Sequence, residues 1–374
     1  MKILFILDLY KPHVWGVEIL FENIISRLEK KGHKIIILTS KFNKEVENYE
    51  ECSENIKIYR VWTNRYNVMF YSIFTWIKLA KKCDLIHTTT YNSAIPSYLI
   101  WKLSWKKVIL TVHEIFWKLW YKFMWWKWFF FKLFEDLIFK FNFEKYLCVS
   151  NYTKNSIRLA YWIDDKKLVT VYNWIDYKKW NKNNYKKEEI EKLRRKYDLC
   201  KYYTWIYYWR PWISKWLEFY IKAIPNIVRQ ISNFKAFLIV PENDKNRVGY
   251  IKTLIKKLNI EKNIIWVCWV KNEELWNYIL ACDFSIVPSL AEWFWFSAVE
   301  SCSLWQKLIV SEIASLPEVV SWKINFINPW DEKSIEKAVF DFYNDKYIEI
   351  PEKSFLWKNN IEKTLENYNE ILWK

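Results

Sequence analysis

Two carboxylates enclose a short aromatic turn in the segment SLAEWFWFSAVE, residues 289–300. A helix that begins between Glu292 and Glu300 could bind a phosphate through its first N–H groups, and Glu300, two turns on, could accept hydrogen bonds from ribose hydroxyls. Those N–H groups belong to Phe294, Trp295 and Phe296. Two glutamates alone are weak evidence, because exposed carboxylates are common. The pattern becomes more specific if Trp293 and Trp295 stand at glycine positions, which would make a flexible turn.

Two cations lie in YYWRPWISKW, residues 207–216, directly after a predicted strand. Arg210 and Lys215 could neutralise the charge that develops on a diphosphate leaving group. The presumed glycine positions beside them are Trp209, Trp212 and Trp216. Solvated surface charges are the alternative interpretation of this segment.

The segment HVWGVE, residues 13–18, follows the first predicted strand and opens the first predicted helix. With glycine in place of Trp15, it becomes a turn of two glycines with Gly16. Bare backbone N–H groups at a helix N-terminus can then meet a phosphate. As written, the indole of Trp15 would fill that space. The alternative is a plain tight turn.

One histidine combines a position at the end of a strand with a plausible catalytic neighbourhood. This is His113 in TVHE, residues 111–114. His87 also ends a predicted strand and is its rival. A single histidine is often structural, so that alternative stays open for both.

The composition joins an excess of tryptophan to a shortage of glycine, with 27 Trp and 3 Gly. Average usage predicts roughly 26 glycines for a chain of this length. The tryptophans also stand where a backbone needs glycine, as in VYNWID (171–176) and NPWD (328–331). Our hypothesis is that most of them represent UGA codons that the organism reads as glycine. A truly tryptophan-rich protein is the alternative, and Trp180 is one residue that we expect to be genuine.

The elements that must position these residues are short apolar runs that alternate with helical patterns. Two series of strands rich in Val and Ile indicate an α/β protein with two doubly wound parallel sheets, because such strands are buried on both faces. The first series is 2–8, 34–39, 84–88, 107–112, 145–149 and 168–172, and the second is 203–208, 235–240, 264–268, 283–287, 307–311 and 324–327. We predict helices over 18–31 and 215–230, and domains over 1–176 and 177–353, followed by a C-terminal helix over 354–374 that packs back toward the N-terminal domain.

The charge and cysteine content restrict the class of partner and compartment. A formal net charge of +16 favours anionic partners such as nucleotide phosphates or an acidic membrane face, although a lysine-rich proteome explains it equally well. The 7 cysteines form no CxxC pair, which argues for reduced thiols in a cytosol and against a zinc site. The chain starts directly with a strand and shows neither a signal peptide nor a run of about 20 apolar residues.

The most apolar region is 116–143, in which lysines interrupt an aromatic run every few residues. It is typical of a basic amphipathic helix that lies on a lipid surface. A buried domain helix with snorkelling lysines is an equally good interpretation. We therefore expect a cytoplasmic protein, either free or peripheral on the inner face of the membrane.

Taken together, these motifs resemble those of the retaining glycosyltransferases of family 4, which have the GT-B fold of two Rossmann-like domains that face each other across a cleft. The resemblance runs from the first strand to about residue 340. It rests on Trp15 and Gly16, His113, CVSNYTKNSI (148–157), NWID (173–176), Arg210 and Lys215, and Glu292 and Glu300. The departure is systematic, since nearly every family glycine is written here as Trp.

The resemblance implies transfer of a sugar from a nucleotide diphosphate donor, UDP or GDP, to a glycan or lipid-linked acceptor. The configuration would be retained, and neither a metal nor a cofactor would be required. Arg210 and Lys215 would hold the diphosphate, Glu300 the ribose, Glu292 the donor sugar, and His113 the sugar near the reaction centre. Further donor contacts are expected from Trp15, Gly16, Trp209, Val270, Phe294, Trp295 and Phe296.

Two other classes of function remain as alternatives. A sugar-nucleotide 2-epimerase would share the fold and the donor carboxylates but would need acid and base groups at C2. A basic aromatic protein that binds nucleic acid or anionic lipid follows from taking every tryptophan at face value. Its weakness is that the tryptophans gather at turns and motifs rather than along one basic face, so nucleic acid is not the partner that we expect.

Overall fold

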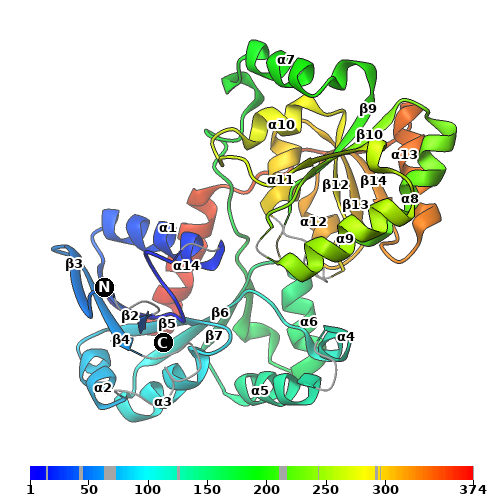
Figure 1. Ribbon diagram of the computed structural model, residues 1–374. Coiled ribbons are helices and arrows are strands. Elements are labelled where there is room, and N and C mark those ends of the chain that lie inside the picture. Colours follow the sequence, from blue (N-terminus) through cyan, green and yellow to red (C-terminus); the bar gives the residue numbers. More distant parts are fainter. Residues whose placement is uncertain are drawn as a thin grey trace. The chain divides into compact units, whose positions relative to one another are not determined.

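The computed structural model describes residues 1–13, 16–41, 45–62, 73–123, 127–209, 217–242, 244–290, 294 and 296–373. The chain divides into two compact units (Figure 1). Unit 1 comprises Met1–Asn173 together with Phe355–Lys374, and unit 2 comprises Trp174–Ser354.

The described part of unit 1 is built on one sheet, with the strand order β3-β4-β2-β1-β5-β6-β7-β8. All neighbours pair in parallel except β3, which is an antiparallel edge strand. Helices α1 and α14 cover one face of the sheet, and α2, α3 and α5 cover the other (Figure 1). The strands are β1 (Lys2–Ile6), β2 (Lys34–Lys41), β3 (Tyr49–Ser53), β4 (Ile56–Trp62), β5 (Leu85–Thr89), β6 (Lys107–Val112), β7 (Lys145–Cys148) and β8 (Leu168–Thr170). The helices are α1 (Gly16–Lys30), α2 (Ile73–Lys81), α3 (Ala94–Ser104), α4 (Trp120–Phe123), α5 (Trp128–Lys140), α6 (Asn151–Tyr161) and α14 (Trp357–Leu372).

Unit 2 contains a second sheet, with the order β11-β10-β9-β12-β13-β14-β15 among its described strands. Only β15 pairs in the antiparallel direction, again at an edge. Helix α8 packs against α9 and α13, and α7 packs against α10. The strands are β9 (Tyr203–Tyr207), β10 (Phe234–Ile239), β11 (Ile264–Val267), β12 (Phe284–Val287), β13 (Lys307–Ser311), β14 (Trp322–Ile327) and β15 (Ile348–Ile350). The helices are α7 (Lys187–Lys196), α8 (Leu217–Gln230), α9 (Lys245–Lys257), α10 (Leu275–Ala281), α11 (Phe296–Ser303), α12 (Leu316–Val319) and α13 (Glu332–Tyr343).

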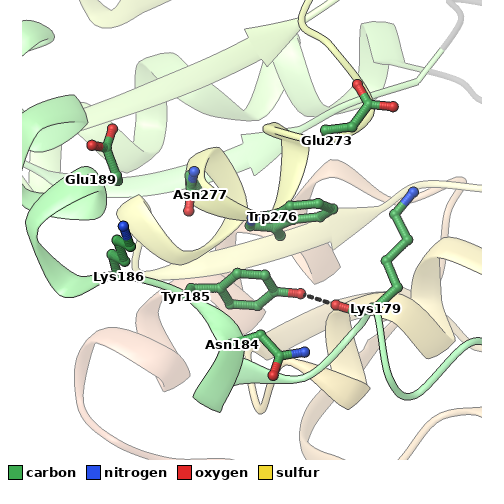
Figure 2. Close-up of a pocket in the computed structure, with 8 residues that line it drawn as sticks. All are labelled: Lys179, Asn184, Tyr185, Lys186, Glu189, Glu273, Trp276 and Asn277. Carbon is green, nitrogen blue, oxygen red and sulfur yellow. Dashed lines mark hydrogen bonds between the residues drawn. The ribbon is translucent and has the colours of Figure 1, made fainter.

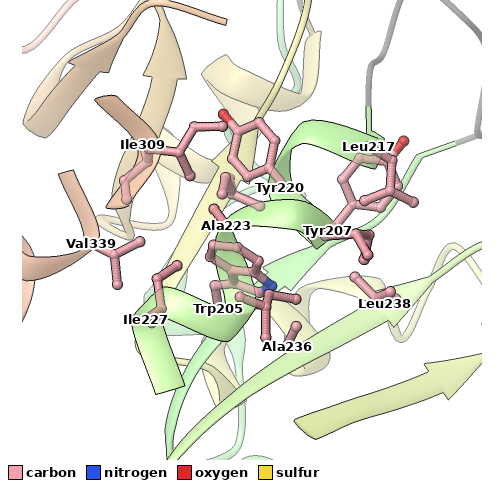
Figure 3. Close-up of a cluster of buried hydrophobic side chains, with 14 of the residues drawn as sticks. Trp205, Tyr207, Leu217, Tyr220, Ala223, Ile227, Ala236, Leu238, Ile309 and Val339 are labelled. Carbon is pink, nitrogen blue, oxygen red and sulfur yellow. The ribbon is translucent and has the colours of Figure 1, made fainter. Parts of the chain in front are cut away.

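The core of unit 2 shows why α8 forms where it does. Its apolar residues recur at helical spacing, so Leu217, Tyr220 and Ile227 are all buried in one cluster with side chains of the strands (Figure 3). The ring of Trp205 on β9 lies 5.1 Å from that of Phe234, at a right angle to it. This edge-to-face packing anchors the strand that leads into the predicted phosphate loop.

The twelve strands predicted from apolar runs are all present, as β1, β2 and β5 to β14. The predicted α/β class with two doubly wound sheets is therefore confirmed. Three edge-proximal strands were missed. Strands β3 and β15 are largely exposed, and β4 alternates buried Ile56 and Ile58 with polar residues, so none of them reads as a continuous apolar run.

Each sheet has one point at which its strand order reverses. In unit 1 the chain builds outward from β1 and then returns to place β5 on its other side, and in unit 2 the same reversal separates β9 from β12. Ligands of open α/β sheets bind at such points, beyond the carboxyl ends of the strands. The predicted segments 13–18, 207–216 and 289–300 all follow strands that flank these two reversals.

Tryptophan is the commonest non-glycine residue at left-handed backbone positions in the described part of the chain. Nine non-glycine residues there have positive φ, and five of them are Trp105, Trp117, Trp162, Trp305 and Trp322. Asn and Asp tolerate this conformation, whereas a bulky side chain is strained there. Trp105 and Trp162 end helices α3 and α6 with φ of 58° and 56°, which is the position where helices most often carry glycine.

The prediction of one amphipathic helix over 116–143 is wrong. The chain instead forms a short 3-10 turn (Trp117–Leu119), α4, and then α5. The physical reason is that the backbone N–H groups of Phe116 and Trp117 both donate to the buried carboxylate of Glu135, which holds this stretch outside a regular helix. None of the helices that the structure describes is both long and apolar enough to cross a membrane.

Candidate functional site

Tyr208 and Trp209 mark the carboxyl end of β9, beside the reversal point of the second sheet. The Tyr208 hydroxyl donates to the Ser297 carbonyl at 3.0 Å and lies 2.8 Å from Ser301 Oγ, which fastens this end of β9 to α11. The Trp209 ring stacks on that of Tyr208 at 4.0 Å, and its indole N–H donates to the Ile286 carbonyl of β12 at 3.4 Å. In the chain as written, the Trp209 indole therefore bonds the neighbouring strand β12 at the point where the strand order reverses.

Glu300 lies on α11, the helix that follows β12 and that Tyr208 joins to the end of β9. Burial raises the pKa of its carboxyl to about 8, and the positive charge of Lys179 acts in the opposite direction. A carboxyl group in this setting is poised to ionise when it gains hydrogen-bond donors such as ribose hydroxyls. Phe296 begins the helix, and its ring lies 5.3 Å from that of the buried Phe294.

Five of the predicted site residues lie outside the described residues. They are Trp15, Arg210, Lys215, Glu292 and Trp295. Gly16, which is described, begins α1, and an added Cβ there would meet no heavy atom within 4 Å. Val270 is half-buried in the loop between β11 and α10. The structure therefore brings Trp209, Phe294, Phe296 and Glu300 to the carboxyl edge of the second sheet.

An open pocket of about 330 Å³ adjoins this edge (Figure 2). Its aromatic wall is Tyr185 stacked on Trp276, with ring centroids 5.1 Å apart, and the Tyr185 hydroxyl donates to the Lys179 carbonyl at 2.5 Å. The Lys179 ammonium lies 5.6 Å from the Trp276 ring. Lys179 lines the pocket, and its positive charge also acts on the Glu300 carboxyl. Sequence reasoning missed this pocket, since its residues come from the polar stretch after 177 and from α10.

In unit 1, His113 follows β6 directly, as predicted from the strand pattern. Its ring lies 5.8 Å from that of Phe21, and its Nε2 is buried with no hydrogen-bond partner among the described residues. Burial lowers the pKa of His113 to about 4, so the imidazole is neutral at physiological pH. A buried nitrogen without a protein partner is one that a ligand can satisfy.

His87, the rival, has a different environment. Its Nδ1 pairs with the Tyr368 hydroxyl and its Nε2 with the Thr111 hydroxyl at 2.6 Å. Burial lowers its pKa to about 3, with a smaller contribution from His113. Both ring nitrogens are satisfied inside the core, so His87 has a structural role.

Glu135 is a second residue that sequence reasoning missed. Its fully buried carboxylate on α5 accepts five hydrogen bonds at 2.7–3.0 Å. The donors are the hydroxyls of Tyr91 and Tyr161, the backbone N–H groups of Phe116 and Trp117, and the indole of Trp120. Burial and the nearby charge of Glu135 raise the pKa of both tyrosines. Glu135 therefore fixes the loop that follows His113; the available signal was an acidic residue within an otherwise aromatic run.

No cluster of three or more His, Cys, Asp or Glu side chains that could hold a metal ion occurs within the described ranges. The carboxyl edge of the second sheet instead carries the single carboxyl group of Glu300 and aromatic rings, and the imidazole of His113 lies at the end of β6 in the first sheet. Metal-independent chemistry stays a prediction.

Two family models match the chain in succession. Residues 14–179 match the model described as Glycosyltransferase Family 4, and residues 189–364 match the model described as Glycosyl transferases group 1. One match falls on the N-terminal part of the chain, which builds the first sheet, and the other on the part that builds the second.

Curated relatives match over parts of their length. An uncharacterized glycosyltransferase of Methanocaldococcus jannaschii is 23% identical over 167 residues, which are 41% of this chain and 42% of that protein. The serotype-specific mannosyltransferase WbdA of Escherichia coli is 24% identical over 199 residues, which are 50% of this chain and 24% of that protein. The matched stretches thus span less than half of the length of these relatives.

Solved structures match over nearly the whole chain. A glycosyltransferase from Rickettsia africae superposes with a TM-score of 0.73 at 20% identity, covering 99% of this chain and 98% of that one. Sucrose-phosphate synthase from Thermosynechococcus elongatus gives 0.75 at 16% identity, covering 100% and 94%. HepE from Anabaena in complex with UDP gives 0.73 at 14% identity, also covering 100% and 94%. Since glycosyltransferase models match both parts of the chain and its sheets share this architecture, the protein belongs to the family 4 glycosyltransferases of the GT-B fold.

Proposed function

We propose that the protein is a retaining glycosyltransferase that moves a hexosyl group from a UDP- or GDP-sugar to a glycan or lipid-linked acceptor without a metal ion. The observation that carries this proposal is the position of Glu300. It lies on the helix after β12, fastened through Tyr208 to the end of β9, where an α/β sheet of this topology binds nucleotides.

The names of the similar proteins support the choice of donor and product class. HepE from Anabaena has been crystallised with UDP and with UDP-glucose, and WbdA of Escherichia coli is named a serotype-specific mannosyltransferase. A nucleotide-linked hexose is the donor class common to these descriptions. A cell-surface polysaccharide precursor is the acceptor class that we favour.

In the proposed reaction the bond between the anomeric carbon and the diphosphate breaks, and the acceptor oxygen bonds to the same face of the sugar. The proton of the acceptor hydroxyl passes to the departing phosphate oxygen. Arg210 and Lys215 stabilise the charge that develops on the diphosphate. Glu300 accepts from the ribose hydroxyls and Glu292 from the sugar. The neutral imidazole of His113 forms a hydrogen bond with the sugar through Nε2, which has no partner among the described residues.

The proposal includes glycine at Trp15, Trp209, Trp293 and Trp295 in the natural protein. The indole at 209 bonds the Ile286 carbonyl at the carboxyl end of β12, where a pyrophosphate would need to approach the backbone. The left-handed tryptophans elsewhere support the same interpretation. Reading the codons tests it: UGA at these four positions is expected, and UGG at most of them would contradict it. We also expect the chain made as written to fold poorly or to be inactive.

The function is tested with a chain made with glycine at the presumed positions. A thermal-shift screen of nucleotide sugars identifies the donor, because a ligand that binds only the folded state raises its stability. Glu292→Ala and Lys215→Ala are then expected to lower transfer by orders of magnitude. Glu261→Ala and Lys262→Ala are matched controls, since these exposed residues precede β11 at the opposite edge of the sheet. Near-normal transfer in either site variant would refute the roles assigned.

The epimerase alternative is tested in the same assay. The protein is incubated with donor alone, and the nucleotide sugar is analysed for a C2 epimer. Transfer to acceptor with no epimer is the expected result. Formation of an epimer without transfer would replace the proposed function with epimerisation.

A further inference from the structure

Helix α5 has an exposed apolar stripe on the side that faces away from the core of unit 1. Phe129, Phe130, Leu133 and Leu137 are 44–63% exposed, and we call these four residues the α5 outer face. Leu133 follows Phe129 by four residues and Phe130 by three, and Leu137 follows Leu133 by four, so they lie along one side of the helix. The opposite side is buried and carries Glu135. This helix therefore has two apolar sides, of which the core of unit 1 needs only one.

The neighbouring helix α3 also carries an exposed apolar side chain. Both helices lie on the same side of the sheet, away from α1 and α14 (Figure 1). The ring of Tyr98 on α3 stacks on Phe141, the residue after α5, at 4.0 Å, which places the two helices next to each other. Leu103 of α3 is 53% exposed. Large apolar side chains gathered on one side of a protein mark a site of interaction rather than ordinary surface.

The charge around the α5 outer face is positive. Lys127 precedes the helix, Lys140 ends it, and both are exposed. Its acidic residues are Glu135, which is buried, and Asp136, which pairs with Lys132 at 2.6 Å. Long lysine side chains can place their ammonium groups among anionic headgroups while the neighbouring rings enter the acyl region.

We propose that the α5 outer face is the surface with which the protein docks on a lipid bilayer that carries anionic headgroups. A second copy of the chain fits this surface poorly, because it would bring the same lysines together and like charges repel. The stripe from Phe129 to Leu137 is about 12 Å long at 1.5 Å per residue, enough for a helix to lie in the interface but not to cross it.

The test measures binding of the full chain to sedimented vesicles of phosphatidylcholine, with and without phosphatidylglycerol. Neither donor nor acceptor is present, so the result is independent of the proposed transferase function. We expect binding that requires phosphatidylglycerol and weakens at high salt. The double variant Phe130→Ser/Leu133→Ser is expected to bind about tenfold more weakly or worse.

The matched control is Tyr250→Ser/Ile348→Ser, which removes one aromatic and one aliphatic side chain of similar exposure, 49% and 53%, from unit 2. This control is expected to bind like the unchanged chain. Circular dichroism and thermal unfolding verify that each variant is folded. Equal binding by the α5 variant and the control would overturn the proposal. A second result would also overturn it: the unchanged chain forms a dimer in light scattering, the α5 variant does not, and neither the unchanged chain nor the variant binds vesicles. The α5 outer face would then join two copies of the chain.

Discussion

At the scale of single residues, the most informative property of the site is the raised pKa of the Glu300 carboxyl. A carboxyl group whose pKa is raised by burial holds a proton that the unfolded chain has already released. Between about pH 4.5 and pH 8 the folded state therefore binds more protons than the unfolded state, and the contribution of Glu300 to stability falls as the pH rises. Such a cost is tolerated at a site that gains compensating contacts from a ligand.

We predict that Glu300→Gln stabilises the ligand-free protein at pH 8 and not at pH 5. The gain at pH 8 should be about 1–2 kcal/mol, since the half-buried carboxyl is partly screened by solvent. Urea unfolding at the two pH values measures it. Glu318→Gln serves as control, because Glu318 is also half-buried and lies on a different helix, α12. An equal effect of the Glu300 variant at both pH values would contradict the assignment.

At the scale of elements, one buried carboxylate organises the loop between β6 and α5. Glu135 accepts from two backbone N–H groups, so the path of the chain after His113 depends on a side chain almost twenty residues further on. Its role could not be predicted from helical periodicity, which counts only apolar positions. Periodicity assigned 116–143 to one helix, whereas the bonds to this carboxylate hold Phe116 and Trp117 in a turn before α4 begins.

Glu135→Gln tests this role. Each carboxylate oxygen accepts from at least two donors. A glutamine amide would replace one of these oxygens with an NH₂ group, which cannot accept, so donors would face donors there. We expect a loss of about 3–5 kcal/mol in the free energy of unfolding and faster amide exchange at Phe116 and Trp117. Glu144→Gln is the control, because that carboxyl is half-buried and forms an ion pair with Lys107 at 4.0 Å. Unchanged exchange at both amides would show that the loop is held by something else.

The helix ends show the clearest mismatch between the residue as written and its element. Trp105 and Trp162 are both 90% exposed, so their indoles gain almost nothing from packing while their backbones remain left-handed. Replacing either with glycine should stabilise the chain by about 1 kcal/mol, and the two gains should add because the sites are independent. Chemical unfolding measures both.

The contrasting variant is Trp76→Gly in α2. Trp76 is 1% exposed and fills the core, so its removal should cost about 3–5 kcal/mol. This contrast separates tryptophans that the fold uses from those that merely occupy glycine positions. Destabilisation by Trp105→Gly and Trp162→Gly would count against the glycine interpretation.

At the scale of the whole molecule, both sheets could be predicted from the sequence, because buried parallel strands occur in it as continuous apolar runs. The order of the motifs along the chain also predicted which strands they follow, as with Trp209 after β9 and Glu300 on the helix after β12. The pocket beside Tyr185 and Trp276 could not be predicted, because it depends on how α7 and the preceding loop pack on α10. The five predicted residues outside the described ranges stay predictions.

The assignment of α14 to unit 1 gives the last prediction. This helix follows unit 2 in the sequence, yet its Tyr368 bonds His87, its Asn360 donates to the Tyr172 carbonyl at 2.7 Å, and its Glu370 pairs with Lys145 at 2.9 Å. Removing residues 355–374 should therefore expose the face of the first sheet that α14 covers and leave buried His87 without its hydroxyl partner.

Hydrogen exchange on the truncated chain is the measurement. Amides of β1, β5 and β6 should lose protection by several kcal/mol, while those of β9, β10 and β12 keep theirs, because the core of unit 2 contains no residue of α14. Tyr368→Phe in the full chain should reproduce a fraction of the effect, about 1–2 kcal/mol, since it removes the hydroxyl partner of His87 and keeps the ring. Tyr343→Phe, at an exposed tyrosine of unit 2, is its control. Full protection of β5 in the truncated chain would mean that the first sheet is stable by itself and that α14 is only appended to it.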